Sequence, residues 1–174
     1  KEGAEVIVLA PFFPEYTVFI NQAGMTPVVV KCREEDFQVD FEALKNAVNE
    51  NTKAIIVNSP NNPSGVVLDE NCIRQLATLL TEKSEQFGRP IAIIADEPYR
   101  ELVYADVDVP YLMNYYCGDN IVSADSYNIC INKSKIFNTP VLLSPMIFDL
   151  LSLFTAESID YSFDGTKLAF KTGS

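Results

Sequence analysis

The sequence predicts an α/β fold of three layers, in which a mostly parallel sheet lies between two layers of helices. Strand-like and helix-like segments alternate along residues 1–122 with short connections, which is typical of βαβ units. The strand-like segments are nearly continuous apolar runs, as strands covered on both faces require. Hydrophobic residues make up 48% of the chain and charged residues 21%, a composition that favours a globular domain over a disordered chain.

Five apolar runs predict the strands of this sheet. Each is short and rich in β-branched residues, and turn-favouring residues or a helical pattern follow it. The predicted strands span Glu5–Ala10, Pro27–Cys32, Lys53–Asn58, Pro90–Ala95 and Asn120–Ala124.

Three segments with apolar residues at helical spacing predict the helices. The first spans Pro14–Ala23, and Gly24 follows it where a helix C-cap favours glycine. Asp40 is expected to cap a second helix and Asp69 a longer third one, because an aspartate side chain accepts hydrogen bonds from the free N–H groups of a first turn. The core-facing residues are Phe41, Leu44, Ala47 and Val48 in the second helix and Ile73, Leu76, Ala77 and Leu80 in the third.

The last third of the chain differs in composition. No arginine follows Arg100, and the hydrophobic periodicity weakens after about Ser123. We therefore expect a partial large domain at residues 1–122 and, at residues 123–174, a tail that is degenerate or foreign to that domain. The apolar stretch Val141–Phe154 contains Pro145 and Asp149 and is shorter than the ~20 residues of a membrane helix, so we expect no membrane span.

Charge and composition disfavour several classes of function. The net charge of −11 repels phosphate backbones and acidic membranes, which argues against nucleic-acid and membrane partners. The chain has no histidine, which excludes Ser-His-Asp and Cys-His catalysis and removes the commonest metal ligand. Its four cysteines form no CxxC pair, so we expect reduced thiols in a cytoplasmic protein and no metal site.

Three loops follow predicted strands and carry side chains that suit a ligand. They are Pro11–Pro14, Ser59–Gly65 and Asp96–Tyr99. Taken alone, each is more typical of a turn, a cap or core packing than of a site. In open parallel sheets, however, ligands bind beyond the carboxyl ends of the strands, so the joint placement predicts a ligand site at these loops.

The side chains of these loops match the needs of a pyridinium ring such as that of pyridoxal phosphate. The ring nitrogen stays protonated beside a carboxylate, the phenolic oxygen needs hydrogen-bond donors, and the ring face needs an apolar or aromatic cover. Asp96, Asn62, Tyr99 and a phenylalanine are groups of these kinds.

Three segments resemble motifs of the class I/II, fold type I pyridoxal-phosphate-dependent aminotransferases of the aspartate aminotransferase superfamily. VNSPNNPSG at Val57–Gly65 resembles their N-P-[ST]-G motif, ADEPYRELVY at Ala95–Tyr104 their D-x-x-Y motif, and APFFPEY at Ala10–Tyr16 their cofactor-stacking loop. Order and spacing agree over about Glu5–Val122. The resemblance implies amino-group transfer between an amino acid and a 2-oxo acid, pyridoxal 5'-phosphate as cofactor, and a homodimer for the full-length family member.

The same resemblance implies roles for individual residues. Asn62 and Tyr99 would bond the phenolic oxygen of the cofactor, and Asp96 would pair with its pyridine nitrogen. Phe13 would stack on the ring, with Phe12 as the second choice.

The family pattern is interrupted at the Schiff-base lysine. The S-x-S-K window reads Ser126–Ile129 here, so Ile129 stands at the lysine position, and Lys133 and Lys135 are candidates only if the loop carries an insertion. On this resemblance we also expect the chain to lack the phosphate-binding arginine, the glycine-rich loop and the C-terminal domain of the family, and we expect Arg100 on the surface. Three interpretations follow: an incomplete aminotransferase, a catalytically inactive remnant, or a fold type I lyase or synthase. An unrelated nucleotide-binding domain is disfavoured because no G-x-G-x-x-G or P-loop run occurs.

Overall fold

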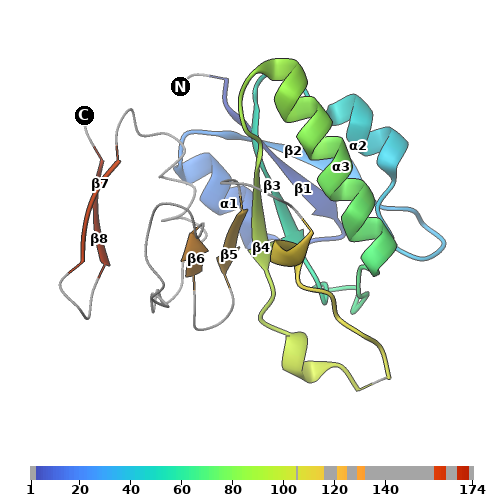
Figure 1. Cartoon of the computed structure of the whole chain (residues 1–174). Helices are drawn as coiled ribbons and strands as arrows, with labels where there is room; N and C mark the ends of the chain where they lie inside the picture. The colour runs from blue at the N-terminus through green and yellow to red at the C-terminus, as the bar shows by residue number, and fades with distance from the viewer. Residues whose placement is uncertain are drawn as a thin grey trace.

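The structure is a computed structural model that describes residues 3–104, 106–115, 121–124, 129–131, 159–163 and 168–172. Its main element is a six-stranded sheet of order β2-β1-β3-β4-β5-β6 (Figure 1). The strands are β1 (Glu5–Ala10), β2 (Thr26–Lys31), β3 (Thr52–Asn58), β4 (Ala92–Asp96), β5 (Ile121–Ala124) and β6 (Ile129–Ile131). The helices are α1 (Glu15–Gln22), α2 (Phe41–Ala47) and α3 (Glu70–Phe87), with short 3₁₀ turns η1 (Arg100–Leu102) and η2 (Leu112–Asn114).

The pairing within this sheet is mostly parallel, as predicted. β1 pairs in parallel with β2 and β3, β3 with β4, and β4 with β5, whereas β5 and β6 pair antiparallel. Parallel neighbours end at the same edge of a sheet, so the segments that leave β1, β3 and β4 emerge together.

Alternate residues of the central strands face two separate cores. In β1, Ile7 and Leu9 belong to one buried cluster, and Val6 and Val8 belong to the other. This alternation follows from the two-residue period of a strand. Because both faces of β1 are buried, the strand reads as an uninterrupted apolar run, which explains why the sequence located it so well.

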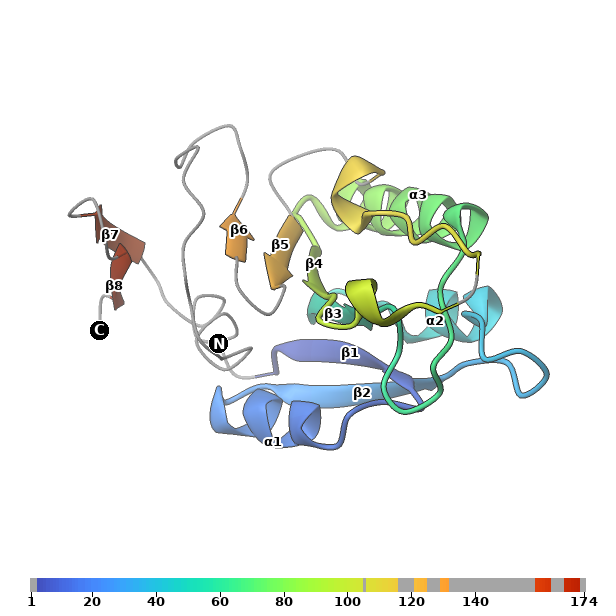
Figure 2. The ribbon, with the colours of Figure 1, turned by 90° about the horizontal axis from the view of Figure 1, so that it is seen from below.

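Helices cover both faces, which confirms the three-layer prediction. The cluster of Ile7 includes Leu44 of α2 and Leu76 of α3, and the cluster of Val6 includes Tyr16 and Ile20 of α1. Figure 2 shows α1 on the side of the sheet opposite α2 and α3.

The predicted boundaries differ from the observed ones by one or two residues. Pro14 and Val48 flank their helices as cap residues rather than belonging to them. β4 begins at Ala92, two residues after Pro90. Proline has no N–H to donate to a strand ladder, which is consistent with its place outside the strand.

A separate two-stranded antiparallel sheet joins β7 (Ile159–Phe163) to β8 (Leu168–Thr172). The division of the chain between residues 122 and 123 stays a prediction. Among the described residues, no helix has both the length and the apolar character that crossing a membrane requires.

We expect Asp69→Ala to lower the free energy of unfolding by about 0.5–2 kcal/mol. The Asp69 carboxylate accepts a hydrogen bond from the Cys72 N–H at 2.6 Å and so caps α3. Urea denaturation followed by circular dichroism measures the loss. Asp69→Asn keeps an acceptor and serves as the control, and equal losses in the two variants would contradict the capping role.

Candidate functional site

The three loops predicted to carry a site do lie at the carboxyl ends of β1, β3 and β4. Asn58 and Asp96 are register partners at the ends of β3 and β4. The Asn58 side chain donates from Nδ2 to the Asp96 carbonyl at 2.8 Å and accepts at Oδ1 from the Asn62 N–H at 2.6 Å. Asn58 therefore ties the loop of Asn62 to the strand end that carries Asp96.

Sequence reasoning did not single out Asn58. The feature of the sequence that could have identified it is its position, as a polar residue at the end of an apolar strand. In the structure, only 7% of Asn58 is exposed. A buried amide needs hydrogen-bond partners, and the two loops supply them.

Asn62 and Tyr99 are brought together as the sequence suggested. The amide Nδ2 of Asn62 donates to the Tyr99 hydroxyl oxygen at 3.1 Å. An amide NH₂ has two donors and this bond occupies one of them, while the Tyr99 O–H proton is left to donate elsewhere. The pair thus presents donors of the kind that an anionic oxygen accepts.

Asp96 is held by Tyr16, to which the sequence analysis gave no contact with Asp96. The hydroxyl of Tyr16, in α1, donates a close hydrogen bond to Asp96 Oδ2. Burial raises the pKa of the Asp96 carboxyl above its usual range, and the Tyr16 hydrogen bond partly opposes this shift. Burial and then the Asp96 charge raise the pKa of the Tyr16 phenol, so Tyr16 keeps its proton.

The two phenylalanines pack around Tyr16. The Phe13 ring meets the Tyr16 ring edge-on, with centroids 5.7 Å apart, and the Phe12 ring is nearly parallel to it at 6.5 Å. Both are partly buried and lie against the α1 core. The two phenylalanines therefore pack against Tyr16, the residue whose hydroxyl bonds Asp96.

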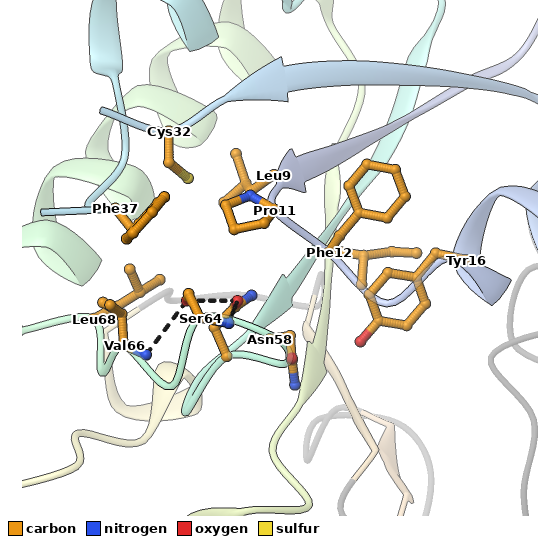
Figure 3. Close-up of a pocket in the computed structure, with 12 residues that line it drawn as sticks. Leu9, Pro11, Phe12, Tyr16, Cys32, Phe37, Asn58, Ser64, Val66 and Leu68 are labelled. Carbon is orange, nitrogen blue, oxygen red and sulfur yellow. Dashed lines mark hydrogen bonds between the residues drawn. The ribbon is translucent and has the colours of Figure 1, made fainter. Parts of the chain in front are cut away.

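Two cavities adjoin these loops. The first, of about 20 Å³, is lined by Phe12, Tyr16, Asn58 and Ser64 among others and is large enough for one water molecule (Figure 3). The second, of about 760 Å³, is open, and its polar lining residues include Asn62 and Tyr99 as well as Asp36, Gln38 and Asn61. Its volume is within the range of small-molecule sites.

The turn that carries Asn62 is closed by its own backbone. The Gly65 N–H donates to the Asn61 carbonyl at 2.8 Å, and the Asn61 N–H donates to the Val66 carbonyl at 2.9 Å. Gly65 has φ +73°, a left-handed conformation that glycine adopts without strain. The dashed lines in Figure 3 include the bond from the Val66 N–H to the Ser64 hydroxyl oxygen, which continues the turn.

The prediction that Arg100 is a surface residue was wrong. Only 13% of its side chain is exposed, because it forms an ion pair with Glu97 and lies over the Tyr111 ring. A single arginine after the D-x-x-Y motif gives no sign of these partners in the sequence. Lys133 and Lys135 lie outside the described residues, and Ile129 is in β6, paired with Ala124.

The described residues fit the ring of pyridoxal phosphate. Burial raises the pKa of the Asp96 carboxyl, and an adjacent cation would stabilise its ionised form. A protonated ring nitrogen is such a cation. The hydroxyl and amide of Tyr99 and Asn62 are donors suited to a phenolate.

The raised pKa of Asp96 predicts how stability depends on pH without cofactor. The unfolded carboxyl ionises near pH 4 and the folded one only at higher pH, so the wild-type chain loses stability as pH rises through this interval. Asp96→Asn cannot ionise, so its stability relative to wild type should increase from pH 4 to 7. Urea midpoints of both proteins across this range measure the difference, and a difference that does not change with pH would contradict the expectation.

Comparison with known proteins gives the family. Residues 1–127 match the family model described as aminotransferase class I and II. The chain is 41% identical over 106 residues to a probable aspartate/prephenate aminotransferase of Aquifex aeolicus, covering 60% of this chain and 25% of that protein. It is 36% identical over 105 residues to an aspartate aminotransferase of Bacillus sp. strain YM-2, with the same two shares of coverage.

Solved structures agree. An aminotransferase of Eubacterium rectale superposes with a TM-score of 0.70 at 50% identity, covering 73% of this chain and 32% of that one. Aspartate aminotransferase of Thermus thermophilus, solved with maleate, gives 0.65 at 31% identity, covering 72% and 31%. The chain spans about a quarter of the length of the curated relatives it matches. On the family match and these structures, the chain belongs to the class I and II aminotransferases, and its sheet and helices are those of their fold type I members.

Proposed function

We propose that this chain carries the cofactor-binding face of a pyridoxal-phosphate-dependent aminotransferase, which transfers an amino group between an amino acid and a 2-oxo acid. The observation that carries the proposal is the set of contacts at one sheet edge. Asn62 bonds Tyr99, and Asn58 joins the loop of Asn62 to Asp96. Membership of the aminotransferase family supports the reaction type.

Four residues would hold the cofactor. Asp96 would accept the N–H of the ring nitrogen, Asn62 and Tyr99 would donate to the phenolic oxygen, and Phe13 would cover one ring face. When bound, pyridoxal phosphate supplies an electron sink for the substrate's α-carbon. The part of this chain is to keep the ring nitrogen protonated and to fix the ring's orientation.

Tyr16 orients Asp96 for this task. Its hydroxyl bonds Oδ2, which leaves the other carboxylate oxygen able to accept from a ring nitrogen. Because Tyr16 is 2% exposed and packed in the α1 core, the carboxylate it bonds is held in a fixed direction. Burial strengthens the attraction between the carboxylate and a pyridinium cation, since water screens less there.

For the whole protein we propose a class of substrates, a homodimeric assembly and a cytoplasmic location. The relatives carry the names of aspartate, aspartate/prephenate and N-acetyl-LL-diaminopimelate aminotransferases, so the proposal stops at amino acids and 2-oxo acids. A homodimer is proposed for the full-length family member. Cys32 and Cys72 are free thiols, which suits a cytoplasmic protein.

The second candidate is a chain that binds the ring but performs no transfer. It is favoured by Ile129, which stands at the expected position of the aldehyde-binding lysine. Lys133 and Lys135 are the candidates that would restore activity.

Titration of the chain with pyridoxal phosphate, followed by borohydride reduction and peptide mapping, tests both candidates. Saturable binding of one equivalent with a label at Lys133 or Lys135 supports the transferase. Saturable binding without a specific label supports the inactive candidate. Pyridoxamine phosphate has no aldehyde and so controls for reaction with surface lysines; absence of saturable binding for both compounds would contradict the proposal.

A further inference from the structure

Arg100 has an environment that the cofactor contacts do not explain. Its guanidinium pairs with Glu97 at 3.1 Å, donates to the Pro110 carbonyl at 3.3 Å, and also donates to the Val109 carbonyl at close range. Its Cζ lies 3.4 Å from the centroid of the Tyr111 ring. The flat, forked guanidinium makes all these contacts at once, which a lysine ammonium cannot do.

These contacts close a loop of the chain. Arg100 directly follows Tyr99, and its carbonyl partners lie nine and ten residues further along. Four residues between them form one wall of the 760 Å³ cavity that Asn62 and Tyr99 also line: Leu102, Val103, Tyr104 and Val107. Arg100 thus holds this wall at both of its ends.

Arg100 also contacts the D-x-x-Y motif, Asp96–Tyr99, which it follows directly. Its ion-pair partner Glu97 lies between Asp96 and Tyr99, and the Glu97 side chain is only 2% exposed. Pro98, next to Glu97, has a fixed φ and adds stiffness. The pair therefore fixes the backbone between the carboxylate that would bond the ring nitrogen and the phenol that would bond the phenolic oxygen.

We propose that Arg100 is a positioning residue, which sets the place of the Tyr99 hydroxyl against Asn62 and so tunes recognition of the cofactor's phenolic oxygen. The inference rests on the proposed function and extends it to a residue that is not assigned a contact with the cofactor. Its effect is confined to the Asn62–Tyr99 side of the site, because Tyr16 of α1 separately holds the Asp96 carboxylate.

Arg89 offers a matched control. It too donates to two backbone carbonyls, of Glu50 and Thr52, and lies near an aromatic ring, that of Phe87. Thr52 begins β3, whereas the Asn62 loop follows the end of that strand. Arg89→Gln therefore removes an arginine with similar structural contacts at the opposite end of the sheet.

The first arm of the test needs no cofactor. The side-chain NH₂ resonances of Asn62, identified by their absence in Asn62→Ser, are recorded by ¹⁵N NMR in the full chain. We expect Arg100→Gln to move them in the direction that Tyr99→Phe does, Arg100→Lys to move them part of the way, and Arg89→Gln to leave them in place. If the Asn62 side-chain resonances of the Arg100 variants stay at their wild-type positions, the inference is overturned. If Arg100→Gln does not fold, Arg100→Lys decides.

The second arm compares pyridoxamine phosphate with its analogue lacking the phenolic oxygen. Arg100→Gln should weaken binding of the first by about fivefold to tenfold, the effect of one hydrogen bond, and binding of the analogue by less than about twofold. Equal losses for both ligands would show a general disturbance of the site and overturn the inference. If the wild-type chain binds neither ligand, the proposed function fails, and the resonances of Asn62 still decide the role of Arg100.

Discussion

Replacing Asp96 with asparagine should lower the affinity of the chain for pyridoxamine phosphate by about tenfold to a hundredfold, the effect of a charge-assisted hydrogen bond. Asparagine has nearly the same shape and still accepts a hydrogen bond from Tyr16, so the loop geometry is kept. What is lost is the negative charge that stabilises a protonated ring nitrogen. Isothermal titration calorimetry at neutral pH measures the affinity of both proteins.

Asp108→Asn is the control for this substitution. It removes one negative charge from an exposed side chain in the segment that follows the D-x-x-Y motif. If the loss arose from net charge alone, the two variants would bind equally weakly. That result, or an Asp96→Asn variant that binds as tightly as wild type, would contradict the role given to Asp96.

Leu76→Ala should lower the free energy of unfolding by about 2–5 kcal/mol. Leu76 is fully buried in α3 and packs in the cluster that joins α2 and α3 to one face of the sheet. Alanine would leave a cavity that the surrounding strands can only partly fill. Urea denaturation followed by far-ultraviolet circular dichroism measures the change.

Leu102 is the matched control for the core substitution. It is the same residue type, but 56% of it is exposed. Leu102→Ala should change the free energy of unfolding by no more than about 0.5 kcal/mol. Comparable losses at Leu76 and Leu102 would mean that the three-layer core is not what stabilises the chain.

The sequence predicted the sheet well because burial on both faces leaves a simple pattern. β1 was located at both ends, since Glu5–Ala10 is apolar throughout its middle. The caps of α2 and α3 were also predicted, because Asp40 and Asp69 each stand directly before a helical apolar pattern. Strands that are buried on both faces and helix caps depend on residues that are close in sequence, so local sequence patterns predict them.

The site was predicted less completely because its contacts join residues far apart in the chain. Tyr16 and Asp96 are eighty residues apart, and Tyr16 fits the apolar face of α1 equally well as a core residue. Arg100 was misjudged for a different reason: its hydrogen-bond partners are nearby backbone carbonyls, which no residue type in the sequence reveals. Asn62 and Tyr99 were predicted to meet at one ligand from their strand-end loops and from the family motifs, but the hydrogen bond between them is visible only in the structure.

In the proposed site, Asp96 keeps a bound pyridine nitrogen protonated. This role is measured by ¹⁵N NMR of ring-labelled pyridoxamine phosphate, bound to the full chain and titrated from neutral to alkaline pH. We expect the nitrogen signal of the wild-type complex to stay at its protonated position at pH values where the free compound has lost this proton, and to lose this protection in Asp96→Asn. A nitrogen that titrates in the wild-type complex as it does in free solution would rule out this role for Asp96.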